Sequence, residues 1–239
     1  MSGRSGARSG PARDPSDVGV TQQSPSLGQR VAQSPTAHTL AVILGVFALQ
    51  QVTAFLGTAR ALFLLDPTFL ARPWAIVTSV YAHAGPSHLL GNAVALVLLG
   101  LLLERHTSTF RYHLFFISTG AIAGLAQVVL GSLTGLPQGV LGASGAIFAV
   151  LGYLIAGNTA SVTLLDSLRL PPRVQLGLGA IIAVGVTVAT GGAGVALIAH
   201  FTGLLLGLVA GRLRLLDVGS SAINHDHNTQ PETRNNRYK

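Results

Sequence analysis

The sequence predicts an all-α membrane protein: a bundle of six transmembrane helices with both termini on the cytoplasmic side. Hydrophobic residues make up 49% of the 239 residues, whereas Asp, Glu, Lys and Arg together make up only 10%. An ordinary soluble domain has about 25% charged residues, and it needs them to cover its surface. The few charges here lie mostly between long apolar runs, which is typical of a chain that crosses a bilayer several times.

Six apolar segments are long enough to cross the hydrocarbon core, which takes about 17–25 helical residues. Each must be helical, because lipid offers the backbone no hydrogen-bond partners. The first is longer than a signal-peptide core of about 7–15 residues and five others follow it, so we expect it to be retained. The expected spans are residues 38–57, 87–103, 112–130, 140–157, 174–190 and 195–211.

The two ends of the chain are polar and show no apolar periodicity. Residues 1–37 are rich in Ser, Gly, Pro, Arg and Gln, a composition typical of disorder. We therefore expect three parts: a disordered N-terminal tail (1–37), a six-helix membrane domain (38–216) and a polar C-terminal tail (217–239).

The orientation follows from the basic residues. With the N-terminus inside, 13 of the 15 Lys and Arg residues fall in inner segments, and only Arg60 and Arg72 fall in outer loops. Basic residues accumulate on the cytoplasmic side of membrane proteins. We expect a multi-pass protein of the cell membrane whose partners are the lipid bilayer and membrane proteins. Because the basic residues flank apolar spans and do not cluster beside aromatic residues, we expect no nucleic-acid partner.

The acidic residues and the absence of Cys exclude several chemistries. All eight carboxylates lie outside the apolar spans, so there is no pair of buried Asp for aspartyl proteolysis and no mid-membrane acid for proton-coupled transport. There is no HExxH motif, and the lack of Cys excludes thiol catalysis and Cys-ligated zinc. We expect neither a metal nor a cofactor.

Four polar residues lie near the outer ends of three expected spans: His88 and Asn92 on the second, Ser144 on the fourth and His200 on the sixth. Intramembrane ionisable residues are functional candidates by default. Ser144 can act as a nucleophile with His200 as its base. The Ser144 backbone N–H, His88 and Asn92 can supply oxyanion donors. No carboxylate is available to orient the His, so the arrangement would be a dyad.

Each of these residues alone is more often structural than catalytic. A Ser in a Gly-rich membrane helix usually allows close packing, and a lone His or Asn often makes an interhelical hydrogen bond. Their common depth favours a site. Small residues, with Gly203 and Gly207 on the sixth span and Gly145 and Ala149 on the fourth, predict that these two helices approach closely.

Three motifs resemble those of the rhomboid family of intramembrane serine proteases, over about residues 74–211. Gly142-Ala143-Ser144-Gly145 resembles its GxSG motif, and the segment from His88 to Asn92 resembles its HxxxN motif. Ala199-His200 with Gly203 and Gly207 resembles AHxxGxxxG. Together and in family order, the three motifs are a specific signal.

The resemblance implies a serine endopeptidase that cuts single-pass transmembrane substrates near their outer end without a cofactor. It implies that Ser144 is the nucleophile, His200 the general base, and His88 and Asn92 oxyanion donors. It also implies that His83 is structural and that the aromatic residue at 148 packs on the catalytic imidazole. The chain departs from the family at Phe148, where Tyr is common, and at Ala75, where Arg commonly follows the Trp; Arg72 lies two residues before Trp74.

Two other readings remain open. A non-catalytic rhomboid-like protein would bind or escort membrane proteins, although such proteins typically lack the Ser or the His. A small-solute transporter is the second alternative, but the spans show no inverted repeat and no polar stripe through the full depth of the membrane.

Overall fold

The computed structural model describes residues 26–135, 139–157 and 196–217, and singly residues 171, 173, 174, 177 and 181. Within that part the regular structure is helical, apart from one β-bridge between Leu65 and Val140. The helices are α1 (Leu27–Gln33), α2 (Pro35–Phe55), α3 (Ala59–Phe63), α4 (Ala75–Tyr81), α5 (Pro86–Leu103), α6 (Thr109–Thr134), α7 (Ser144–Gly157) and α10 (Leu197–Arg212).

Five of the six expected spans coincide with helices of the structure, namely α2, α5, α6, α7 and α10. Among the described residues, α2, α5 and α6 are long and apolar enough to cross a membrane, and α7 and α10 are shorter apolar helices. The fifth expected span, 174–190, lies outside the described residues except at three single positions.

Helical structure begins earlier than the sequence predicts. Both α1 and the start of α2 lie within the stretch 1–37 that we expected to be a disordered tail, of which residues 1–25 lie outside the described part. The reason is capping. The Ser34 hydroxyl accepts a hydrogen bond from the Ala37 N–H (3.1 Å) and donates to the Glu104 carboxylate (2.7 Å). Polar residues that look like a tail therefore serve as helix caps.

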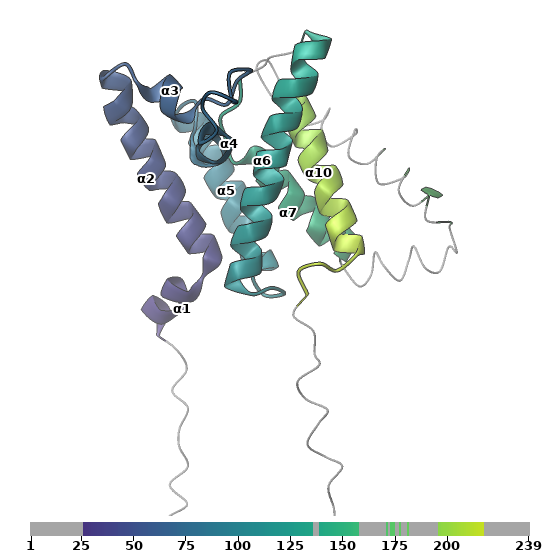
Figure 1. Cartoon of the computed structure of the whole chain (residues 1–239). Coiled ribbons are helices and arrows are strands. Elements are labelled where there is room, and N and C mark those ends of the chain that lie inside the picture. Colours follow the sequence, from purple (N-terminus) through teal and green to yellow (C-terminus); the bar gives the residue numbers. More distant parts are fainter. Residues whose placement is uncertain are drawn as a thin grey trace, which may run out of the picture.

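The helices α6, α7 and α10 pack side by side, and α2 stands at the edge of the bundle (Figure 1). Tyr112 and Phe116 of α6 are fully buried in a core that includes Leu96 of α5 and Val150 of α7. Large apolar side chains such as Leu90 and Leu98 of α5 are more than 60% exposed (65% and 63%). Exposed apolar surface of this extent is typical of helices that face lipid.

The helices α7 and α10 touch backbone to backbone through glycine. A Cβ atom on any of three α10 glycines would collide with a carbonyl oxygen of α7. The facing pairs are Gly203 with Gly145, Gly207 with Ala149, and Gly211 with Tyr153. Residue numbers rise together along both helices, so α7 and α10 run in the same direction. The close approach expected from the small residues is confirmed.

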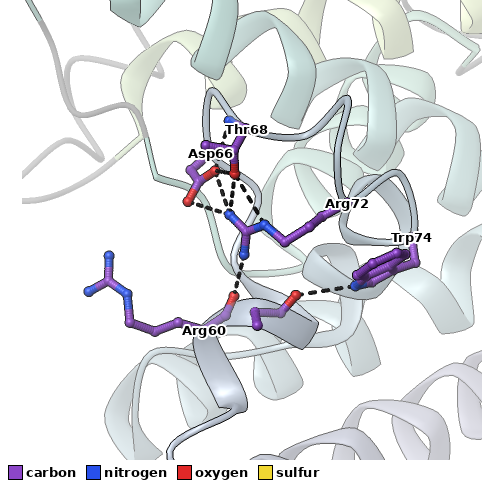
Figure 2. A network of polar contacts seen from close by, with 6 residues as sticks. Arg60, Asp66, Thr68, Arg72 and Trp74 are labelled. Carbon is purple, nitrogen blue, oxygen red and sulfur yellow. Dashed lines mark hydrogen bonds and ion pairs between the residues drawn. The ribbon is translucent and has the colours of Figure 1, made fainter.

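The connection between α2 and α5 is folded around one arginine (Figure 2). Arg72 donates to both carboxylate oxygens of Asp66 (2.7 Å each) and to the carbonyl oxygen of Arg60 (3.0 Å). Asp66 also accepts hydrogen bonds from the backbone N–H and hydroxyl of Thr68, and the Trp74 indole donates to the Ala61 carbonyl oxygen. Arg72 therefore anchors this loop, although it lies two residues before Trp74 and not directly after it.

Candidate active site

Ser144 is the first residue of α7, and backbone hydrogen bonds hold the segment that leads into it. Val140 exchanges two backbone hydrogen bonds with Leu65 (3.2 and 2.8 Å), and the Gly142 N–H donates to the Ser79 carbonyl oxygen (2.9 Å). The sequence predicts a helix from residue 140. Because residues 140 and 142 are paired with Leu65 and Ser79, α7 begins only at Ser144. Ser144 is half-buried, and its backbone N–H belongs to a first helical turn, where no intrahelical partner exists.

Gly142 brings His88 to this segment. Its φ of +137° lies in a region that L side chains rarely adopt. A Cβ atom here would lie 2.7 Å from Cε1 and 3.0 Å from Nε2 of His88. The His88 imidazole therefore packs on the backbone two residues before Ser144, which brings the start of α5 to the start of α7.

His200 lies on the first turn of α10 and is 8% exposed. Its ring stacks on Phe148 with centroids 4.3 Å apart. Phe148 is one turn after Ser144 on α7, and Gly145 packs against Gly203. The turns that carry Ser144 and His200 are thus in contact. Among the described residues no hydrogen bond joins their side chains, and the buried Nδ1 of His200 has no partner. Catalytic hydrogen bonds often tighten only when substrate binds.

Asn92 lies one turn after His88 on α5 and is 7% exposed. Its amide nitrogen donates to the carbonyl oxygen of His88 (3.0 Å). The structure therefore places Asn92 beside His88 and ties its amide to the same helix.

His83 supports His88 from the loop before α5. The two rings meet edge to face with centroids 5.2 Å apart. The His83 backbone N–H donates to Oε1 of Gln50 (2.8 Å), and Nε2 of Gln50 donates back to the His83 carbonyl oxygen (3.3 Å). Burial, together with the neighbouring His88, lowers the pKa of His83 to about 4, so the His83 ring is neutral at physiological pH.

Sequence reasoning missed two glutamines that hold this region together. Gln50 of α2 ties the His83 loop, and Gln127 of α6 accepts hydrogen bonds from the start of α10. Both are buried, with 7% and 1% of their surface exposed. The available signal was an amide side chain within an apolar span, which requires a partner because lipid provides none.

The arrangement combines a hydroxyl at a helix start, an imidazole on the adjoining helix and nearby hydrogen-bond donors. These are the parts that acyl transfer needs. In the ranges that the structure describes, no three His, Asp or Glu side chains are grouped so that they could hold a metal ion.

Comparisons with known proteins place this site within a recognised domain. The Rhomboid domain family model matches residues 70–216, which include every residue expected at the site. The chain is 31% identical over 130 residues to RHOMBOID-like protein 1 of Arabidopsis thaliana, covering 51% of this chain and 32% of that protein. It is 34% identical over 82 residues to Rhomboid protease GluP of Bacillus subtilis (strain 168), covering 34% of this chain and 15% of that protein. RHOMBOID-like protein 4 of Arabidopsis thaliana is 30% identical over 143 residues, covering 57% of this chain and 34% of that protein. The chain thus spans about a third or less of the length of these relatives.

Proposed function

The chain belongs to the rhomboid family, and from that premise we propose that it is an intramembrane serine endopeptidase with a Ser144–His200 dyad. Its substrates are single-pass membrane proteins, cut within the transmembrane segment near its outer end. The observation that carries the proposal is the contact between the first turns of α7 and α10, where Ser144 and His200 lie.

The proposed reaction is acyl transfer in two steps. Nε2 of His200 takes the proton of the Ser144 hydroxyl while Oγ attacks the scissile carbonyl carbon. The resulting oxyanion accepts hydrogen bonds from the Ser144 backbone N–H and from the side chains of His88 and Asn92. His200 then protonates the leaving amine, and a water molecule, activated by the same imidazole, hydrolyses the acyl-enzyme.

We further propose that the protein lies in the plasma membrane, crosses it six times and has both termini in the cytoplasm. The parallel direction of α7 and α10 supports this, because a chain that crosses the membrane twice in the same direction must cross back in between. The 38 intervening residues, 158–195, contain the apolar stretch 174–190. The excess of basic residues in the segments then assigned to the inside supports the orientation.

The test is cleavage of a tagged model transmembrane substrate by the purified protein in liposomes. Ser144→Ala and His200→Ala should each reduce cleavage by roughly 10³-fold or more. The matched control is Ser118→Ala, which removes a hydroxyl that donates within α6 to the Phe115 carbonyl oxygen (3.2 Å). Undiminished cleavage by either dyad variant would overturn the proposal.

Labelling with a fluorophosphonate probe separates the alternatives. The proposal predicts labelling of Ser144 in the wild-type chain and its loss in His200→Ala. A wild-type chain that captures membrane proteins but is neither labelled nor able to cleave them is a non-catalytic binder. Solute flux that persists in Ser144→Ala would favour a transporter.

A further inference from the structure

The helix that carries His200 cannot cap its own start. α10 begins at Leu197, and its N-cap residue is Ala196, which has no side-chain acceptor. The first N–H groups of a helix have no intrahelical carbonyl partner, and Ser, Thr, Asn or Asp normally supplies one at the N-cap. Three residues further, the His200 N–H donates to the Ala196 carbonyl oxygen (3.0 Å) and begins the regular hydrogen-bond pattern.

A glutamine from another helix supplies the missing cap. Oε1 of Gln127, on α6, accepts hydrogen bonds from the backbone N–H groups of Ile198 (3.0 Å) and Ala199 (3.2 Å). These are the second and third positions of α10, the donors that an N-cap side chain reaches. Gln127 is only 1% exposed, so water does not compete for these donors.

The same face of α6 also supports the nucleophile. Ala123 lies one turn before Gln127, and a Cβ atom added to Gly145 would lie 2.8 Å from the Ala123 methyl carbon. Gly145 directly follows Ser144, and the residue capped by Gln127 directly precedes His200. Two adjacent turns of α6 therefore contact the neighbours of both proposed dyad residues.

We propose that Gln127 is a positioning residue: it caps α10 from α6 and thereby sets the position of the His200 imidazole relative to Ser144. This rests on the proposed function, in which His200 is the general base. Without the cap, the first turn of α10 loses two hydrogen bonds in a water-poor environment and unwinds or shifts, and His200 moves with it.

The direct test is Gln127→Met, which keeps the length of the side chain and removes the acceptor oxygen. In liposomes we expect kcat and the rate of fluorophosphonate labelling to fall by about 10- to 100-fold, because small misplacements of catalytic groups are costly. KM should stay within about twofold, since the oxygen removed accepts hydrogen bonds from backbone N–H groups of α10 and the cap acts on the position of His200. A residue with a merely structural role would lower the thermal midpoint without this split between kcat and KM.

A second-site rescue isolates the cap. Adding Ala196→Ser to Gln127→Met provides a local hydroxyl acceptor for the same N–H groups, and most of the lost labelling rate should return. Gln127→Glu, which keeps an acceptor oxygen, should retain more activity than Gln127→Met. The matched control is Thr119→Val, two turns earlier on α6, which removes a buried hydroxyl that donates to the Phe115 carbonyl oxygen (2.7 Å) and leaves α10 untouched.

The outcomes separate this inference from the proposed function. If the wild type is active and Gln127→Met is labelled at the same rate, the inference alone is overturned. The same holds if the double variant with Ala196→Ser recovers no labelling. A wild type that neither cleaves nor is labelled overturns both. If Gln127→Met does not fold, Gln127→Asn, which withdraws the acceptor by one methylene, takes its place, and an unchanged labelling rate in that variant again overturns the inference.

Discussion

The phenyl ring of Phe148 lies stacked on the imidazole of His200, with centroids 4.3 Å apart and ring planes inclined by 17°. Phe148 is on the same helix as Ser144, one turn further along. The stack therefore fixes the plane of the imidazole relative to the helix of the proposed nucleophile. The hydroxyl that the usual family Tyr would add is not needed for this contact.

Phe148→Tyr should consequently keep most of the activity, because the ring and its stacking remain. Phe148→Leu should lower the rate of fluorophosphonate labelling by about 3- to 10-fold, since aromatic pairs contribute about 0.5–1.5 kcal/mol beyond their buried area. Comparing labelling rates of the two variants checks this. Equal rates for Phe148→Leu and the wild type would contradict a positioning role for the ring.

Gly203→Ala should be among the most damaging single-methyl additions. The added carbon would collide with the carbonyl oxygen of Gly145, and backbone cannot move aside as a flexible side chain can. We expect a clear drop in the thermal midpoint together with loss of cleavage, because α10 must separate from α7. The control is Gly45→Ala on α2, where a Cβ atom meets nothing within 4 Å. A drop of the same size in the control would rule out this explanation.

Gly142→Ala should reduce activity through two separable effects. Its φ of +137° strains an L residue, and the added carbon meets the His88 ring at 2.7 Å. Gly135→Ala is the matched comparison, since that residue has a φ of +72° but open space around it. Gly135→Ala should cost about 1–2 kcal/mol of stability from backbone strain and leave activity intact. Gly142→Ala should also lower kcat by displacing His88; similar kcat values for the two variants would show that the His88 contact is unimportant.

The Asp66–Arg72 ion pair should be sensitive to acid. Hydrogen bonds from the Thr68 hydroxyl, and then from Arg72, hold the pKa of the Asp66 carboxyl below its usual value of 3.8. A carboxyl whose pKa is lowered on folding stabilises the fold above its unfolded pKa, and that contribution disappears as the pH falls through the folded value. Asp66→Asn should thus lower the thermal midpoint at neutral pH, and the difference from the wild type should shrink below pH 3.8.

A double-mutant cycle with Arg72→Gln measures the coupling within that pair. The Asp66 and Arg72 side chains are about a fifth exposed (22% and 20%), so the coupling should be about 0.5–1 kcal/mol. A difference that stays constant through the acid range, or a coupling near zero, would mean that the ion pair does not hold the loop.

The amino-acid sequence by itself predicted the helices that the structure describes at five of the six expected spans, and it named the residues of the proposed site. Apolar runs and the need to satisfy the backbone in lipid predict α5 and α10 to within two residues of their observed starts. The glycine spacing along α10 predicts its contact with α7, because only Gly lets backbones approach so closely. These features depend on residues near one another in the chain, so a local pattern reveals them.

Only the tertiary structure decided how distant residues are paired. Gln127 caps the start of α10, about 70 residues further along the chain, and Gln50 holds the His83 loop from 33 residues before it. The start of α7 also depends on pairing with Leu65 and Ser79. A buried amide or carboxylate needs a hydrogen-bond partner, but its own sequence neighbourhood does not say which one. That choice is made when the helices pack.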